Sequence, residues 1–171
     1  MENIIIRKAK VKDEKGIADF IKEAFRRKNW IYTGSNKPLS NKSIKKAEKE
    51  LKSKSPDSYC FIAIDKKTEK IIGSTIISFK KKGRVRHKIN LGWGLHPDYQ
   101  GKGIGTLLVK EILKFAKKKG FKIAIVEAAV ENIASVKLAK KCGFRIVGKI
   151  KKGLLTDDKR YIDTVILWRE L

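Results

Sequence analysis

The sequence predicts an α/β domain, spanning residues 1–171 as a single unit, with about seven strands in one mixed sheet and helices on both faces. Three observations predict it. Apolar residues alternate over 89–95, which is the period of a strand with one packed face. Apolar residues from 104 onward take helical spacing, and 121–126 is apolar on both faces, as in a buried central strand. A chain of 171 residues, 42% hydrophobic, is long enough to bury a core.

The expected elements alternate between strand-like and helix-like patterns along the chain. Asp13 is a good N-cap for the first helix, because a carboxylate suits the N–H groups and the positive end of a helix. Residues 59–64 and 71–79 predict an antiparallel hairpin. In chain order the expected strands are 4–9, 59–64, 71–79, 89–95, 121–127, 144–150 and 161–168, and the expected helices begin at 13, 40–43, 104 and 132.

Three glycines within five residues mark the point where the strand 89–95 gives way to a helix. A helix start has unpaired N–H groups and a positive dipole end, and both suit a phosphate. Glycines let the backbone approach a ligand closely, and Lys102 adds a positive charge. The order is neither the dinucleotide fingerprint Gly-x-Gly-x-x-Gly nor a Walker loop. The alternative is a glycine turn with no ligand.

The order Gln100-x-x-Gly103-x-Gly105, after a strand that ends Leu-His-Pro, resembles the acyl-CoA loop of the GCN5-related N-acetyltransferase (GNAT) family. The block from Asn132 to Phe144 resembles the helix that follows in that family. The resemblance implies acetyl-CoA as cosubstrate, held mostly by main chain where strands 89–95 and 121–127 splay apart. The cofactor-binding residues that it implies are Gly94, Leu95, Gln100, Gly101, Lys102, Gly103, Ile104, Gly105, Thr106, Asn132 and Ser135.

The catalytic residues are where this sequence departs from the family pattern. The position of the usual Tyr acid is Ala139, and the usual carboxylate position is Asn90. Glu127, which could order a water or the amine, and Tyr161, which could donate a proton to the thiolate, are the candidates instead. Their alternatives are a surface charge for Glu127 and a packing residue for Tyr161.

The acceptor site is implied only by resemblance. In the family the region between the first two helices borders the acceptor, which makes Trp30 and Tyr32 candidate substrate-binding residues. Aromatic anchors that pin a loop to the core are an equal alternative. The segments 134–135 and 157–167 look most like the branch that includes ribosomal-protein alanine N-acetyltransferases.

The implied activity is direct transfer of an acetyl group to a primary amine, on a protein N-terminus or a small molecule, in a ternary complex. Two rival functions remain open: a CoA-binding sensor that has lost turnover, and a basic protein associated with RNA or the ribosome. The net charge of +24 motivates the second rival, although a Lys-rich solvated surface is the plainer explanation because the lysines are scattered along the chain.

Several classes of protein are disfavoured by composition. No apolar run approaches the roughly 20 residues of a membrane helix, and the first residues lack the pattern of a signal peptide, so we expect a cytoplasmic protein, as monomer or homodimer. Cys60 and Cys142 are the only cysteines and are expected to be buried, unpaired thiols. No Cys/His cluster has metal-ligand spacing, so no metal is expected.

Overall fold

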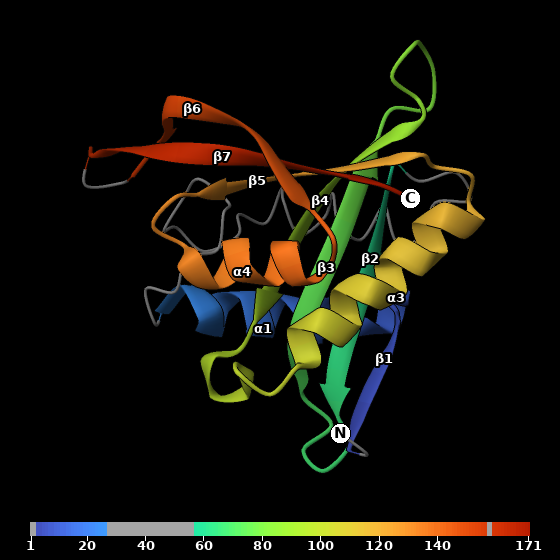
Figure 1. The fold of residues 1–171 in the computed structure, drawn as a ribbon. Coiled ribbons are helices and arrows are strands. Elements are labelled where there is room, and N and C mark those ends of the chain that lie inside the picture. Colours follow the sequence, from blue (N-terminus) through green and yellow to red (C-terminus); the bar gives the residue numbers. More distant parts are fainter. Residues whose placement is uncertain (1–2, 27–56, 157–158) are drawn as a thin grey trace.

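The computed structural model describes residues 3–26, 57–156 and 159–171. Their strands form one seven-stranded sheet (Figure 1). Its strand order is β1-β2-β3-β4-β5-β7-β6. Only β4 and β5 are parallel neighbours, and every other adjacent pair is antiparallel. The predicted mixed sheet is therefore confirmed. The strands are β1 (Ile4–Lys8), β2 (Ser58–Asp65), β3 (Ile71–Phe79), β4 (Lys88–Leu95), β5 (Ile123–Ala129), β6 (Arg145–Leu155) and β7 (Tyr161–Glu170).

Three α-helices accompany the sheet in the described part of the chain: α1 (Glu14–Arg26), α3 (Ile104–Lys118) and α4 (Ile133–Lys141). Short 3-10 turns precede α1 at Val11–Asp13 and α3 at Pro97–Tyr99. The helix expected to start at 40–43 lies outside the described residues. α3 stops where Gly120 takes the left-handed conformation, with φ +86°, as its sequence predicts. No helix among the residues that the structure describes is both long and apolar enough to cross a membrane.

Both faces of the sheet are covered, as expected. Phe61, Ile62 and Ala63 follow one another in β2 and are all buried, although successive side chains of a strand point to opposite faces. Phe61 and Ala63 pack in the main core, which contains the buried stripe of α3 with Leu108 and Ile112. α3 lies across β2 and β3 (Figure 1), and α1 also contacts β3.

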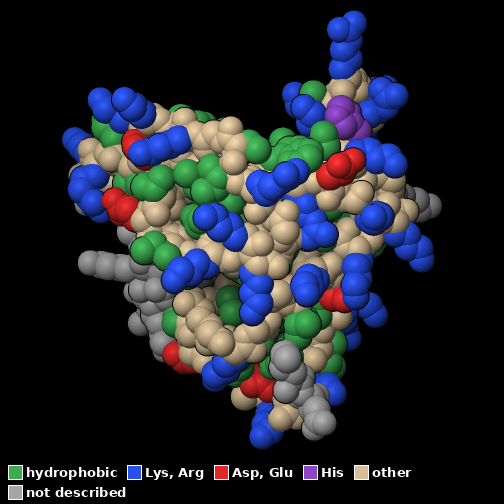
Figure 2. Space-filling view, viewed as in Figure 1, with side chains coloured by type: hydrophobic (Ala, Val, Ile, Leu, Met, Phe, Trp, Pro, Cys, Tyr) green, Lys and Arg blue, Asp and Glu red, His purple; other side chains and the backbone are tan. Residues whose placement is uncertain are grey.

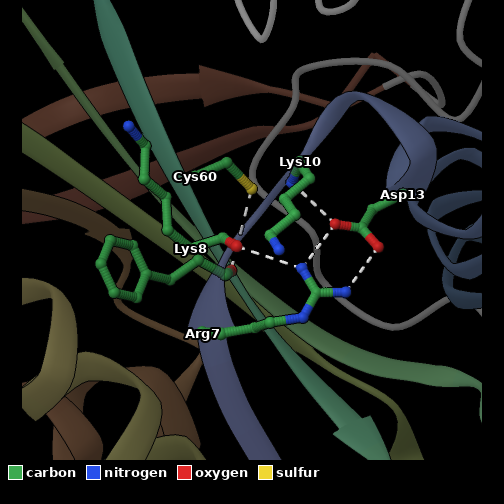
Figure 3. Close-up of polar contacts among 6 residues, drawn as sticks. Arg7, Lys8, Lys10, Asp13 and Cys60 are labelled. Carbon is green, nitrogen blue, oxygen red and sulfur yellow. Dashed lines mark hydrogen bonds and ion pairs between the residues drawn. The ribbon is translucent and has the colours of Figure 1, made fainter.

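An ion pair fastens β1 to the start of α1 (Figure 3). The Arg7 guanidinium donates to both carboxylate oxygens of Asp13, at 2.6 and 2.7 Å, and the Lys10 N–H donates to Asp13 Oδ2 at 2.7 Å. The expectation that Asp13 caps α1 is therefore revised. Its carboxylate accepts from residues that precede it in the chain, because it closes the 3-10 turn before the helix.

The last hairpin is longer than the sequence predicts. β6 runs on to Leu155, with breaks in its register against β7 between Ile146 and Gly148 and between Ile150 and Leu154. At the second break Lys152 takes a positive φ of +55°, and its N–H donates to Asp163 Oδ1 at 2.9 Å. Bulges insert residues without ending a strand. Residues 151–155, which lie beyond the predicted end of the strand at 150, are therefore part of β6.

Candidate functional site

β4 and β5 part from each other partway along the sheet. They pair in parallel only at Lys88–Ile123, Ile89–Ala124 and Asn90–Ile125. Beyond that point β4 continues to Leu95 while paired with β3, and β5 continues to Ala129 while paired with β7. The described strands therefore leave a gap between the carboxyl ends of two parallel strands, at the place where the splay was expected.

On the β4 side of the gap, alternation along the strand decides which main-chain groups face it. The His96 N–H donates to the carbonyl oxygen of Ile72 in the β3 ladder, at 2.7 Å. Counting back from His96, residues at even positions point their N–H and C=O groups at β3, and those at odd positions point away from it. The main-chain groups of Leu91, Trp93 and Leu95 therefore face the gap, whereas those of Gly94 face β3.

On the β5 side the same reasoning applies. The Val130 N–H donates to the carbonyl oxygen of Asp163 in β7, at 3.0 Å. Residues at even positions of β5 therefore pair with β7, and the main chain of Glu127 and Ala129 faces the gap. Two strands thus offer peptide groups to one space, which suits a ligand that carries amide groups of its own.

The glycine turn stands at the mouth of this gap. Gly101 and Gly103 have φ of +74° and +77°, a region that side chains disfavour, and Gly103 is the N-cap of α3. The first helical bond runs from the Leu107 N–H to the Gly103 oxygen, 3.2 Å. The N–H groups of residues 104–106 therefore have no partner within the helix and are available to bind an anion.

Gly105 has a second role, which is packing. A Cβ built on Gly105 would lie 3.2 Å from Cδ2 of Leu138 in α4. The absence of a side chain thus allows α3 and α4 to approach each other beside the gap. Asn132 directly precedes α4 and is its N-cap, because its Oδ1 accepts from the Ser135 N–H at 3.0 Å.

Three side chains hold the glycine turn in place. The Tyr99 hydroxyl donates to Asp65 Oδ2 at 2.7 Å, which ties the turn to the end of β2. The Gln100 amide donates to the Leu95 oxygen at 3.3 Å, and Lys102 Nζ donates to the Asp98 oxygen at 2.9 Å. The Tyr99 hydrogen bond, followed by the bond from the Lys67 N–H, holds the pKa of Asp65 below its usual value.

Sequence reasoning missed the Asp65–Tyr99 bond. The two residues are 34 positions apart, and neither belongs to a motif. Their pairing depends on the β2–β3 turn and the glycine turn meeting at the same end of the sheet, which no local pattern reports.

Comparison with known proteins agrees with this geometry. The Acetyltransferase (GNAT) domain family profile matches residues 3–145. The chain belongs to the GNAT acetyltransferase family. It is 34% identical over 106 residues to N-acetyltransferase aca1 of Schizosaccharomyces pombe, covering 61% of this chain and 50% of that protein. The chain spans half or less of the length of the curated relatives that it matches.

Solved structures match this GNAT domain over its whole length. A ribosomal-protein-S5-alanine acetyltransferase from Vibrio fischeri has a TM-score of 0.84 at 22% identity, covering 99% of this chain and 94% of that one. A GNAT superfamily phosphinothricin acetyltransferase from Sinorhizobium meliloti, solved in complex with AcCoA, has a TM-score of 0.84 at 23% identity, covering 99% and 89%. At these identities the likeness establishes the fold.

Glu127 lies beside the gap of this GNAT domain. Its Oε1 accepts from the hydroxyl of Thr164, a fully buried residue of β7, at 2.7 Å. Val126 and Ala128 point into the core beneath α3 and α4, so Glu127 points to the opposite face of the sheet, as Asn90 does. The structure thus places a carboxylate, an amide and a hydroxyl on one face of the sheet, and the hydroxyl is hydrogen-bonded to the carboxylate. Sequence reasoning singled out Glu127 but missed Thr164.

Tyr161 is placed away from Glu127. It starts β7, it is 60% exposed, and Lys152 Nζ lies 5.5 Å from the centre of its ring. Alternation along β7 puts Tyr161 on the same face as Val165, which packs in the core, and therefore on the face opposite to Thr164. The two candidate catalytic residues do not converge. Trp30 and Tyr32, the candidate acceptor-binding residues, lie outside the described residues.

Two further positions bear on the chemistry. Ala139 of α4, at the place of the usual Tyr acid, is fully buried in the core. His96 is also buried; its Nδ1 accepts from the Asp98 N–H at 3.3 Å, and its Nε2 lies 3.2 Å from Glu23 of α1. His96 thus links the turn to α1. Within the described ranges, no cluster of three His, Cys, Asp or Glu side chains could hold a metal ion.

Proposed function

We propose that this GNAT domain is an acetyl-CoA-dependent N-acetyltransferase that moves an acetyl group to a primary amine by direct transfer in a ternary complex. One observation carries the proposal. After Asn90 and Ile125, β4 and β5 part and turn main-chain groups toward a shared gap, whose mouth is the N-terminus of α3. A ligand with a pyrophosphate at one end and amide groups along its length fits both features.

The residues present fit acetyl-CoA without a large set of recognition side chains. The left-handed Gly101 and Gly103 keep the turn free of Cβ atoms, and the amides of 104–106 suit a pyrophosphate. The gap-facing groups of Leu91, Trp93 and Leu95 suit the pantetheine amides. Acetyl-CoA supplies the thioester whose acetyl group is transferred.

The described residues beside the gap supply little acid–base chemistry. Asn90 carries an amide, and Ala139 is buried and has no proton to give. Alignment of the two reactants and polarisation by main-chain N–H groups therefore provide most of the rate. Glu127, held by Thr164, orders the amine or a water at the acceptor face.

The acceptor is a primary amine on a protein N-terminus or a small molecule. The net charge of +24 disfavours a polycation such as spermidine and favours a neutral or acidic acceptor. The likeness to a protein named ribosomal-protein-S5-alanine acetyltransferase supports N-terminal alanine as one acceptor to try.

The test is release of free thiol from acetyl-CoA by the purified chain, with a panel of amines that includes neutral and acidic peptides beginning with alanine, small amines and spermidine. We expect turnover with at least one neutral or acidic amine, and weaker binding of spermidine than of a neutral amine at low salt. Spermidine binding as strong as that of the neutral amine would contradict the charge argument.

A sensor is the second candidate, because the usual acid position is a buried Ala139. Tight binding of acetyl-CoA with no turnover on any amine of the panel would favour the sensor. Failure to bind either CoA or acetyl-CoA would reject both functions together.

A further inference from the structure

The loop between β3 and β4 carries a dense group of positive charges. Residues 80–88, here called the basic loop, run from the end of β3 to the first residue of β4. They contain Lys80, Lys81, Lys82, Arg84, Arg86 and Lys88, and the first five are exposed. The loop projects beyond the sheet (Figure 1), and in Figure 2 it forms a knob on which Lys and Arg side chains gather. The lysines are scattered along the sequence, but the fold concentrates several of them here.

The basic loop is folded rather than extended. The Arg86 N–H donates to the Gly83 oxygen at 3.3 Å, and the Lys88 N–H donates to the Val85 oxygen at 3.0 Å, so two turns follow each other. Gly83 has φ +88°, which a turn of this kind needs. The Arg86 guanidinium also donates to the Gly83 oxygen at 3.3 Å. The positive charges are therefore displayed on a compact element.

More cations lie at the same end of the sheet. The carbonyl oxygen of His87, at the base of the basic loop, accepts from the N–H groups of Lys122 and Ile123 at 2.9 and 3.3 Å. Those residues follow the C-terminal end of α3, so its exposed lysines lie at the end of the sheet from which the basic loop projects. We call the basic loop together with Lys117, Lys118, Lys119 and Lys122 the basic pole.

The fold accounts for only part of this charge. Lysines in the last turn of α3 complement the helix dipole, which explains Lys117 and Lys118. Two carboxylates offset some of the positive charge at this end of the sheet. Asp57 pairs with Lys81 at 2.9 Å, and Glu170 lies opposite Ile123, next to Lys122. Arg86 has one such reason, its hydrogen bond to the Gly83 oxygen, but among the described residues neither Arg84 nor Arg86 pairs with a carboxylate. Like charges held this close repel one another, and an anionic partner relieves that repulsion.

We propose that the basic pole binds the phosphodiester backbone of a nucleic acid. The charges extend over a loop and a helix end, which matches a chain of phosphates better than one small anion. The basic loop has a single apolar side chain, Val85, so it has little to insert into a membrane. β4 separates the basic loop from the glycine turn by roughly 23 Å, at about 3.3 Å per residue, so both ends can be occupied at once.

The test compares two variants of the full chain that lose the same charge. The loop variant carries Lys80→Gln, Lys82→Gln, Arg84→Gln and Arg86→Gln. The control variant carries Lys15→Gln, Lys22→Gln, Lys140→Gln and Lys141→Gln, which remove four exposed lysines from α1 and α4. Binding to a 20-base-pair RNA duplex, to the DNA duplex of the same sequence and to phosphatidylserine-containing vesicles is measured over a range of salt concentrations, with thermal unfolding as the check on folding.

We expect the loop variant to bind a nucleic acid duplex at least tenfold more weakly than the parent at about 0.1 M salt, with a salt slope smaller by roughly 3. The control variant should keep most of the parent's affinity. The ratio of RNA to DNA affinity identifies which phosphodiester chain is preferred. Equal losses of affinity in both variants would mean that the net charge of the protein, and not the basic loop, drives binding, and would overturn the proposal. So would unchanged binding by the loop variant, or loop-dependent binding stronger to vesicles than to either duplex.

Discussion

Thr164 donates its hydroxyl to Glu127 Oε1 at 2.7 Å, across two neighbouring strands of the sheet. Thr164 is fully buried, so its rotamer is set by packing, and the hydrogen bond transmits that order to the carboxylate. Glu127 is a residue that sequence analysis proposed for catalysis, and Thr164 is the residue that gives it a fixed direction.

Glu127→Gln should lower kcat by less than about 100-fold, because alignment rather than proton transfer carries most of the rate. Tyr161→Phe should cost less than Glu127→Gln, because Tyr161 points to the opposite face of the sheet. Steady-state rates with the best amine of the panel measure both. A loss larger than 100-fold in either variant would show that one side chain dominates the chemistry.

Thr164→Val keeps the shape of a buried side chain and removes the donor to Glu127. We expect KM for the amine to rise more than kcat falls, because the carboxylate is still present but less ordered. In the Glu127→Gln background the same change should add little, since the two residues act as one unit. Additive losses in the double variant would mean that Thr164 acts through packing instead.

Gly103→Asp should abolish acetyl-CoA binding in calorimetry. It places a side chain, with a negative charge that repels the pyrophosphate, at the start of α3. The left-handed φ of +77° adds a strain of about 1–2 kcal/mol. Gly120→Asp is the matched control: it has φ +86° at the other end of the same helix and carries the same charge. The control should lose stability but keep affinity. Unchanged affinity of Gly103→Asp for acetyl-CoA would contradict the proposal that the glycine turn binds the cofactor.

The Arg7–Asp13 pair should make the free energy of unfolding depend on pH in the acid range (Figure 3). The hydrogen bond from Arg7 lowers the pKa of Asp13; burial opposes the shift, and the bond from the Lys10 N–H adds to it. The unfolded chain therefore binds this proton more readily than the folded one. The stabilisation is complete above the unfolded pKa of about 3.9 and is lost as pH falls through the lower folded pKa.

Asp13→Asn should cost about 1.5–3 kcal/mol of unfolding free energy at neutral pH, because it removes a buried carboxylate from a bidentate pair. Urea unfolding at about pH 7 and about pH 3 measures the difference, which should shrink at the lower pH. A difference that stays constant or grows on acidification would contradict the assignment.

Cys60 and Cys142 should resist alkylation in the folded protein. Cys142 is buried, as the sequence predicts, whereas Cys60 is only partly buried. Desolvation raises the pKa of Cys60 to about 12, and it also raises the pKa of Cys142, so neither thiol is a thiolate near neutral pH. Mass spectrometry after iodoacetamide treatment at about pH 8 should show no label without denaturant and two labels in urea. Rapid labelling of the native chain would contradict the raised pKa values of the two thiols.

Local sequence predicted the elements that surround the gap. Each of these elements depends on residues that are neighbours in the chain, so it can be predicted without knowledge of the fold. They are the alternation over 89–95, the glycines from 101 to 105 and the helical spacing after Ile104. Boundaries were less secure, and β6 runs past its predicted end because bulges absorb residues that look like a loop.

The amino-acid sequence by itself determined that a glycine turn joins a strand to a helix, since backbone conformation there depends on the absence of Cβ atoms. Only the tertiary structure decided which main-chain groups face the gap, that Thr164 holds Glu127, and that Tyr99 reaches Asp65. It also decided that the basic loop and the end of α3 meet at one pole. These relationships join residues far apart in the chain, and they follow from strand order and register, which a local pattern does not specify.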